Sequence, residues 1–319
     1  MGAYLIRRLI TNIGVLFVIC VGLFILVRAV PGDPIDVLVP PEVRGSAGPE
    51  FLELKRHELG LDQPLVVQFG RWLGDAVTGD FGMSFQYNRS VTGMLLERVG
   101  PTVLLMGTAL LISWLLAFPL GILAALRRNS AVDYVTAAFS LGAISIPTFF
   151  LGIGAIYVFS LKLQVLPSSG MSSPDDGSGL DILRHLAMPA VLLGLAGAGP
   201  YVRYVRSGLL SELYADYVRT AMAKGASRLR AVVRHALRNA LIPLVTVAAL
   251  SIPNLLGGAV VVETVFSWPG MGQLAVAATN AQDYPVITGF ALLISVLVIA
   301  SNLAADLLYA VVDPRVRLG

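Results

Sequence analysis

The sequence predicts an all-α, polytopic membrane protein with six transmembrane helices, and three observations carry this prediction. Hydrophobic residues make up 56% of the 319-residue chain and charged residues only 13%, whereas a soluble domain has about 25% charged residues. Six stretches approach the roughly 20 apolar residues that cross a bilayer. Basic residues gather in alternate connecting segments, which is typical of a multi-pass protein.

The six predicted spans are almost free of ionisable side chains. The first five contain no Asp, Glu, Lys, Arg or His, and the sixth contains only Asp306, near its end. The fourth is the shortest and holds Pro189 and Pro200, so its limits are the hardest to place. The predicted spans are Leu9–Val27, Thr102–Leu126, Tyr134–Leu161, Leu186–Val202, Ala240–Val262 and Val286–Val312.

The first span is predicted to be a retained helix rather than a signal peptide. Arg7 and Arg8 precede it, as basic residues also precede a signal core. However, its 19 residues exceed a typical signal core, and the following "VRAVPGDP" lacks an A-x-A cleavage pattern.

The distribution of Lys and Arg predicts that both termini face the cytoplasm (N-in, C-in). With the N-terminus inside, the inner segments hold fourteen of the 23 basic residues, eight of them between Arg203 and Arg238. The outer segment 31–100 has six basic and ten acidic residues, and Glu263–Pro285 has two acids and no base. Such a bias in short loops sets the orientation of a membrane protein.

The spans divide the chain into four regions, namely an N-terminal helix (1–30), an extracytoplasmic segment (31–100), a five-helix core (101–312) with a cytoplasmic coupling loop at 206–239, and a cytoplasmic tail (313–319). In the extracytoplasmic segment, "PEFLELKRHELG" is helix-like, and a second helix is indicated by helical spacing of Leu65, Phe69, Trp72 and Leu73. The segment forms either a small subdomain or a packed loop that covers the first two helices.

The sequence lacks the motifs of a catalytic or self-powered protein. It has no G-x-x-x-x-G-K-[ST] phosphate loop, no H-E-x-x-H and no G-x-S-x-G. The glycine-rich "GLAGAG" (Gly194–Gly199) lies in an apolar span, where small residues favour close helix packing over nucleotide binding. The central thirds of the spans carry no charge of the kind that ion-coupled carriers use. Asp306 is either an interfacial acid or such a group.

Cysteine and charge exclude further classes. The single cysteine, Cys20, permits no disulfide within the chain, and three scattered histidines make no zinc-type cluster. A net charge of only +3 gives no argument for a nucleic-acid partner. We therefore expect a pathway that binds no metal or cofactor and that depends on energy from elsewhere.

The densest positive charge lies between two spans, in "YADYVRTAMAKGASRLRAVVRHALRNALIP" (Tyr214–Pro243), which has six basic residues and one acid. After Gly225, the residues Arg230, Arg234 and Arg238 form a stripe at i, i+4 and i+8 of an amphipathic helix. Before it, "DYVRTAMAK" predicts a short helix that Gly225 ends with a positive φ. This hairpin either rests on anionic lipid headgroups or docks a soluble partner and transmits its movement to the flanking spans.

Several blocks along the chain resemble one family. The segment "YVRTAMAKGAS…RHALRNALIP" resembles the cytoplasmic EAA-type loop of the permease subunits of ABC importers, in the dipeptide and oligopeptide branch. The blocks "FILVRAVPGDP", "ELGLDQPL", "GDFGMSF", "SIPTFFLG", "VETVFSWPGMGQL" and "DPRVR" are similar to the same B-type permease subunit, in the same order. The resemblance covers nearly the whole chain and implies a type I ABC importer permease fold.

The loop departs from the general motif in two places. The usual Glu-Ala-Ala opening corresponds here to Thr220-Ala221-Met222 or Ala221-Met222-Ala223, and the closing Pro243 lies further from Gly225, as in the peptide branch. The resemblance implies that the 214–243 loop docks an ATPase subunit. The docking residues that it implies are Tyr217, Arg219, Ala221, Lys224, Gly225 and Arg228.

The resemblance also implies partners and a location. Permeases of this family pair with a homologous second permease, two cytoplasmic ATPase subunits and an extracytoplasmic substrate-binding protein, in the bacterial plasma (inner) membrane. ATP and Mg would be bound by the ATPase subunits and not by this chain. Family members serve dipeptides, oligopeptides, glutathione or nickel, so the sequence leaves the solute open.

Prolines and glycines within the spans mark a candidate pathway. A proline kinks its helix, and membrane helices tolerate this where a neighbour or cavity water satisfies the freed carbonyl. The fifth span either lines the pathway or kinks for packing. The aromatic residues after it suit the membrane interface, where this segment forms either an outer gate or part of the surface that meets the binding protein. The candidate pathway and gate residues are Pro147, Pro253, Asn254, Gly257, Gly258, Phe266 and Trp268.

The combined prediction is a non-catalytic permease subunit of an ATP-driven importer, which forms the pathway for dipeptides, oligopeptides or related small solutes together with a second permease. The alternative is a self-sufficient secondary transporter or channel, which would move solute alone in proteoliposomes. A membrane-embedded enzyme would need a clustered nucleophile or metal ligands at membrane depth, and the sequence shows none.

Overall fold

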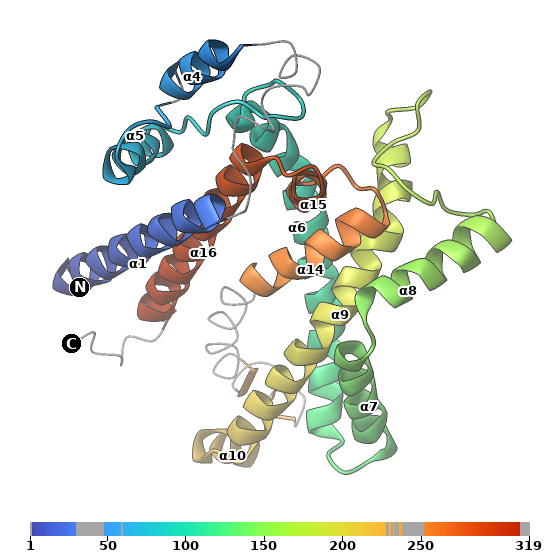
Figure 1. Cartoon of the computed structure of the whole chain (residues 1–319). Coiled ribbons are helices and arrows are strands. Elements are labelled where there is room, and N and C mark those ends of the chain that lie inside the picture. Colours follow the sequence, from blue (N-terminus) through green and yellow to red (C-terminus); the bar gives the residue numbers. More distant parts are fainter. Residues whose placement is uncertain are drawn as a thin grey trace. The chain divides into compact units, whose positions relative to one another are not determined.

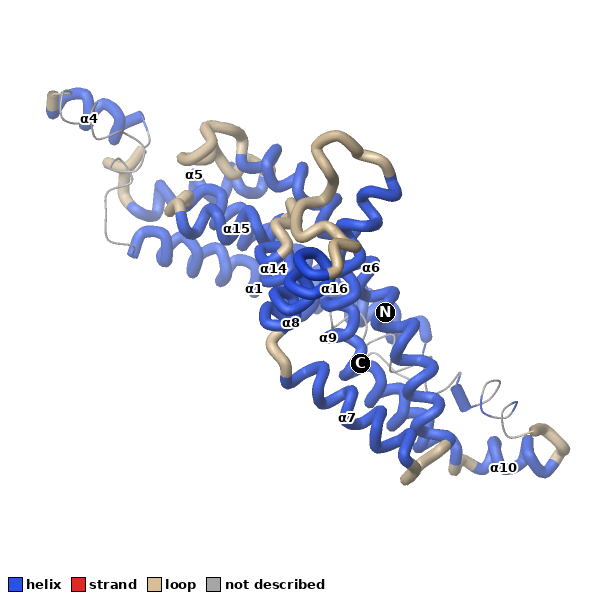
Figure 2. The backbone as a smooth tube through the Cα atoms, turned by 90° about the vertical axis from the view of Figure 1, so that its right-hand side faces the viewer, coloured by secondary structure: helices blue, strands red, loops and turns tan. Residues whose placement is uncertain are grey.

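The computed structural model describes residues 2–29, 48–58, 60–227, 230, 232, 236, 237 and 252–312. Within these residues every regular element is a helix, apart from two isolated β-bridges (Figure 2). Four described helices are long and apolar enough to cross a membrane, and a bent pair makes a fifth candidate. The all-α class is confirmed. The count of six spans and the N-in, C-in orientation stay predictions, since 240–251 and the predicted tail 313–319 lie outside the described residues.

The chain divides into two compact units. Unit 1 comprises Met1–Val99 and Leu274–Ile299, and unit 2 comprises Gly100–Gln273 and Ala300–Gly319. In unit 1, α4 (Pro49–Glu58) precedes α5 (Leu65–Val77), and α5 contacts α1 (Gly2–Ala29). The ring centroids of Phe24 and Phe69 lie 5.3 Å apart, and those of Phe24 and Trp72 lie 5.9 Å apart. The helical spacing of aromatic residues in this segment therefore reflects the face that α5 packs on α1.

The first turns of α6 (Val91–Leu126) belong to a second cluster in unit 1. Val91 and Leu95 are buried there with Leu274 and Ala278 of α15 (Met271–Asn280) and Val286 of α16 (Tyr284–Val312). Burial of these side chains contributes on the order of 25 cal/mol per Å² of apolar surface. The cluster holds three helices around a loop that contains the "GDFGMSF" block.

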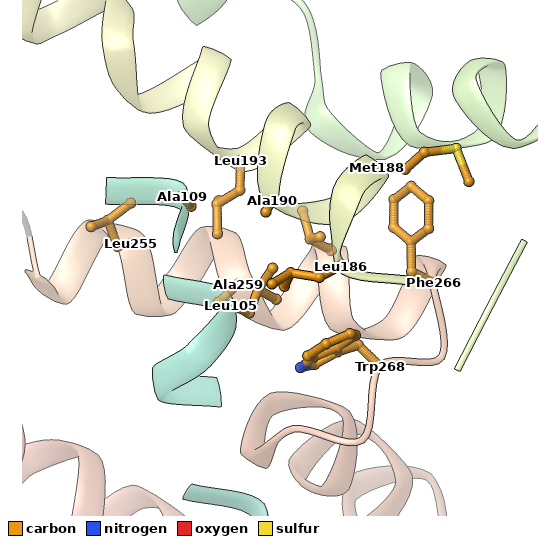
Figure 3. Close-up of a cluster of buried hydrophobic side chains, with 11 residues drawn as sticks. Leu105, Ala109, Leu186, Met188, Ala190, Leu193, Leu255, Ala259, Phe266 and Trp268 are labelled. Carbon is orange, nitrogen blue, oxygen red and sulfur yellow. The ribbon is translucent and has the colours of Figure 1, made fainter. Parts of the chain in front are cut away.

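In unit 2, α9 (Gly179–Leu213) is the central helix. It contacts α7 (Ala131–Ser145), α8 (Thr148–Ala155) and α14 (Ile252–Val265) (Figure 1). Apolar side chains from α6, α9, α14 and the segment after α14 form its main core (Figure 3). The labelled members of this core are Leu105, Ala109, Leu186, Met188, Ala190, Leu193, Leu255, Ala259, Phe266 and Trp268.

Glycines bring α9 close to its neighbours. A Cβ at Gly194 would lie 2.8 Å from Ile112 Cγ2, and the Ser113 hydroxyl donates a 2.7 Å hydrogen bond to the Gly194 carbonyl. A Cβ at Gly199 would lie 2.8 Å from the Ser140 carbonyl oxygen on α7. The structure therefore confirms that "GLAGAG" is a packing motif, because a side chain at these positions would push the helices apart.

The third predicted span is bent. The helix Ala131–Ser145 and the segment Thr148–Lys162, which continues α8 as the π-helical turn η1 (Ile156–Lys162), meet at 95°. Pro147 stands at this break as the residue before α8, and Ile146 has the extended conformation (φ −91°, ψ 123°) that a following proline favours. The predicted continuous span Tyr134–Leu161 is therefore two helices.

Two helices are longer than the apolar stretches that predicted them. Helix α6 starts eleven residues before Thr102, and α9 extends beyond both limits of Leu186–Val202. The prediction stopped at ionisable residues such as His185 and Arg203. A helix continues past them because its backbone hydrogen bonds do not depend on apolar side chains.

Candidate functional site

The predicted docking helix is present as α10 (Asp216–Ala223), immediately after α9. Val218 is the one buried residue among its eight, with 1% of its surface exposed. It packs in a small core with Leu209 of α9 and Ala125 of α6. A single apolar side chain thus anchors α10, and most of its surface is accessible.

The end of α10 has the geometry of a Schellman motif. The Gly225 N–H donates to the Met222 carbonyl at 3.0 Å, and the Ala226 N–H donates to the Ala221 carbonyl at 3.1 Å. Gly225 has φ +90°, which L side chains rarely adopt. The predicted helix stop at Gly225 is therefore confirmed. A Cβ at Gly225 would meet nothing within 4 Å, so the demand for glycine here is conformational rather than steric.

The predicted docking residues on α10 lie on its accessible surface. Arg219 has a side chain 74% exposed and lies 3.9 Å from the carboxylate of Asp216. Tyr217 is 39% exposed and donates a hydrogen bond to Glu212, while Ala221 is half-buried and Lys224 is exposed. The structure therefore groups five of the six predicted residues around α10 and its cap. Arg228, like Pro243 and the arginines at 234 and 238, lies outside the described residues.

A buried ion pair ties the end of α9 to α7. Arg206 donates from Nε to Asp133 Oδ1 at 2.5 Å and from Nη2 to Asp133 Oδ2 at 2.8 Å. The Asn129 N–H also donates to Asp133 Oδ2 at 3.0 Å. The side chain of Asp133 is 7% exposed and that of Arg206 is 32% exposed. This two-bond geometry fixes orientation as well as distance, so it holds α9 against α7 about two turns before α9 ends at Leu213.

The candidate pathway residues of α14 are spread over opposite faces. Gly258 faces α9, since a Cβ there would lie 3.1 Å from Leu193 Cδ1. Gly257 is exposed, as are Val261 and Thr264 at i+4 and i+7 on the same side. Pro253 and Asn254 lie in the first turn of α14, but their side chains are outside the described residues. Helix α14 therefore has a packed face and an accessible face.

Phe266 and Trp268, the aromatic residues of the predicted outer gate, are buried inside the protein. Their exposed fractions are 2% and 0%, and both belong to the main core of unit 2 (Figure 3). The Trp268 indole N–H donates to the Pro101 carbonyl at 2.9 Å. A buried indole N–H needs an acceptor to offset the loss of water, and Pro101, inside α6, supplies it. The role of both residues at an outer gate stays a prediction.

Sequence reasoning missed Glu263, whose carboxylate is fully buried. Glu263 Oε1 accepts from the Thr102 hydroxyl at 2.7 Å, and Oε2 accepts from the Gly272 and Gln273 N–H groups at 2.8 and 3.1 Å. These amides are in the first turn of α15, where a carboxylate is stabilised by free N–H donors and the helix dipole. A Cβ at Gly270 would lie 2.1 Å from this carboxylate, which explains the glycine in "WPGMG".

Asp283 was also missed and plays a similar part within unit 1. It has no exposed surface, and its carboxylate accepts from the Ser84 hydroxyl at 2.5 Å and from the Phe85 and Gln86 N–H groups at 3.1 and 3.2 Å. The two acids of the segment Glu263–Pro285 are thus structural ligands of backbone amides. Among the described residues, no three His, Cys, Asp or Glu side chains gather as a metal site.

Two family matches cover nearly the whole chain. Residues 117–318 match the family described as "Binding-protein-dependent transport system inner membrane component", and residues 1–106 match the N-terminal region of such membrane components. The first match spans more than half of the chain and includes α7–α10 and α14–α16. It thus contains both the α10 surface and the accessible face of α14.

Relatives of similar length are found in several bacteria. The chain is 44% identical over 317 residues to a protein of Brucella suis biovar 1 that is described as a peptide permease, with 99% of each chain covered. It is 38% identical to the oligopeptide transport system permease protein AppB of Bacillus subtilis, covering 99% of this chain and 100% of AppB. It is 40% identical to the glutathione transport system permease protein GsiC of Escherichia coli strain K12, covering 98% of each.

A solved structure shares the fold. A chain of the MetNI methionine ABC transporter, in an inward-facing conformation, superimposes with a TM-score of 0.55 at 19% identity, covering 69% of this chain and 96% of that one. These matches set aside the alternative of a secondary transporter or channel. The chain belongs to the family of binding-protein-dependent transport system inner membrane components, and it is a multi-pass permease subunit of an ABC importer in the bacterial inner membrane.

Proposed function

We propose that this subunit forms, with a second homologous permease, a translocation pathway for short peptides and related solutes. The relatives from Brucella suis, Bacillus subtilis and Escherichia coli are described as peptide, oligopeptide and glutathione permeases. These solutes have amide bonds and free carboxylates in common. An extracytoplasmic binding protein delivers the solute, and two cytoplasmic ATPase subunits bind ATP and Mg. The chain itself carries no catalytic residue.

The exposed, capped helix α10 is the observation that carries this proposal. It presents Arg219 and Lys224 to solvent, ends in a rigid Schellman stop at Gly225, and is held by one buried valine. It continues directly from α9, which contacts α7, α8 and α14. Movement of an ATPase bound to α10 would therefore be transmitted to α9, and through α9 to the three helices that pack on it.

The accessible face of α14 is the proposed lining of the pathway. Gly257, Val261 and Thr264 lie along it at helical spacing, opposite the face that packs on α9. These three residues are a glycine, a short aliphatic side chain and a hydroxyl. None of them would bind one solute strongly, so this face suits a passage for varied solutes. The break at Pro147 places α8 against the packed face of the same helix.

Site-specific photocrosslinking tests the docking. Cys20, the single native cysteine, is replaced by alanine, and a benzophenone maleimide is attached to Arg219→Cys in the intact transporter. The matched control is Tyr87→Cys, whose native side chain is 49% exposed in the predicted extracytoplasmic segment. We expect an adduct with the ATPase from position 219 and none from position 87. Absence of an ATPase adduct at 219, or equal adducts at both positions, would contradict the proposal.

The solute class needs a separate experiment. The binding protein that purifies with the native transporter is denatured, and its released ligand is identified by mass spectrometry. We expect short peptides or a peptide-like thiol. A sugar or a bare metal ion would overturn the solute assignment and leave the docking of α10 untouched.

A further inference from the structure

A cavity of about 340 Å³ with both polar and apolar walls lies between α7 and α9 in unit 2, at the end from which α10 continues. Its walls combine two arginines with hydroxyl and amide groups. Its polar lining residues include Asn129, Tyr134, Ser140, Arg203, Arg206 and Ser207. The translocation and docking residues discussed above are not among its lining residues.

The cavity carries a net positive charge. Asp133 is its one acidic lining residue, and its carboxylate accepts two hydrogen bonds from Arg206. Arg203, one turn earlier on α9, is exposed and forms no ion pair with the described part of the chain. Its guanidinium is therefore available to an anion, and the Ser207 hydroxyl follows at i+4 on the same side of the helix.

The depth of the cavity in the membrane matches the headgroup region. Asp133 and Tyr134 lie in the first turn of α7, and Arg203 and Arg206 come directly after the uncharged stretch of α9 that ends at Val202. Polar and basic side chains at the ends of spanning helices lie at the level of lipid phosphates, and tyrosine is enriched there. An anion at this depth is most readily supplied by the bilayer itself.

An apolar stripe leads from the cavity along α7. Tyr134, Leu141 and Ile144 are 68%, 58% and 51% exposed, and they share one side of the helix at i, i+7 and i+10. Ala137, which lines the cavity, lies between them. A cationic pocket that opens onto an exposed apolar stripe is complementary to an amphipathic anion. A free phosphate would pair with the pocket but would leave the stripe uncovered.

We propose that this cavity binds an anionic phospholipid, with its phosphate against Arg203 and Ser207 and an acyl chain along Tyr134, Leu141 and Ile144. Arg206 holds the wall of the site in place through Asp133 and adds its remaining N–H groups. The inference is independent of the solute and of the docking of α10. Basic pockets between transmembrane helices bind anionic headgroups in the same way.

Native mass spectrometry of the intact transporter tests the site. The complex is released from nanodiscs of phosphatidylglycerol and phosphatidylcholine in equal amounts, and the retained lipids are counted. We expect preferential retention of phosphatidylglycerol, and we expect Arg203→Ala to weaken it about fivefold, the factor for one basic residue near an anionic surface. Arg203→Lys should restore most of the retention. The matched control, Arg28→Ala, removes an exposed arginine at the end of α1 and should change nothing.

Three outcomes would overturn the proposal. One is equal retention of the two lipids by the unmodified transporter. Another is the same retention in Arg203→Ala and Arg28→Ala. The third is an oxidant-induced disulfide between Leu141→Cys, in a Cys20→Ala background, and a cysteine introduced into the second permease, which would show that protein and not lipid covers the stripe. Because Arg203 is exposed, Arg203→Ala is expected to fold, and its melting temperature in neutral detergent should equal that of the unmodified protein.

Discussion

Thr102 and Glu263 lie 161 positions apart in the sequence, yet the Thr102 hydroxyl donates a 2.7 Å hydrogen bond to the Glu263 carboxylate. The same hydroxyl accepts from the Met271 N–H at 2.9 Å. One threonine and one glutamate thus satisfy the first N–H groups of α15 in a fully buried network. Such networks stabilise a protein when every member is paired, and removing one member leaves the others unsatisfied.

We predict that Glu263→Gln destabilises the protein by about 2 kcal/mol. A glutamine amide has one oxygen and one NH2 group, so whichever way it points, an N–H or O–H donor of the network loses its acceptor. Thermal unfolding of the detergent-solubilised transporter measures the effect. The control, Glu97→Gln, changes a carboxylate 57% exposed that pairs with Arg89, and such a surface pair contributes less than about 1 kcal/mol. Equal losses in the two variants would refute the network.

The Asp133–Arg206 pair should show strong energetic coupling. In a double-mutant cycle of Asp133→Ala and Arg206→Ala, we expect a coupling energy of about 1–3 kcal/mol, because the geometry is bidentate and one partner is buried. The exposed Asp216–Arg219 pair, 3.9 Å apart, is the matched control and should show no measurable coupling. Additive effects of the two alanines at 133 and 206 would mean that the ion pair does not hold α7 to α9.

Replacing a glycine by alanine should destabilise the protein at Gly199 of α9 and stabilise it at Gly142 of the neighbouring helix α7. A Cβ at Gly199 would lie 2.8 Å from the Ser140 carbonyl oxygen, so we expect Gly199→Ala to cost about 1–3 kcal/mol. A Cβ at Gly142, in α7, would meet nothing within 4 Å, so Gly142→Ala should stabilise the helix by about 0.5–1 kcal/mol. Melting temperatures of the two variants decide the matter. A stabilised Gly199→Ala would show that α7 and α9 are not in close contact.

Much of this fold could be predicted from local patterns. Apolar length predicted the long helices, aromatic spacing predicted α5, and the glycine after "DYVRTAMAK" predicted the end of α10 at Gly225. These features depend on residues within a few turns of one another, where periodicity and backbone preference act directly.

The buried acids could not be predicted in the same way. In the sequence, Glu263 and Asp283 are two acids in a loop without basic residues. They therefore predicted only that this loop lies outside the cytoplasm. Their partners, Thr102 and Ser84, lie more than 150 positions away, and hydrogen bonds to backbone N–H groups leave no residue-type signature. The burial of Trp268 could not be predicted for a related reason, since its indole N–H is satisfied by one distant carbonyl at Pro101.

In the proposed function, α10 is the element through which the ATPase drives the pathway, and variants at Gly225 test this role most directly. Because Gly225 has φ +90°, valine should cost about 1–2 kcal/mol there, while asparagine tolerates a left-handed backbone. Uptake and ATP hydrolysis are measured together in reconstituted transporter with its binding protein. We predict that Gly225→Asn retains both activities, and that Gly225→Val assembles normally but transports far less solute for each ATP hydrolysed. Full uptake and unchanged solute-stimulated hydrolysis in Gly225→Val would contradict the account.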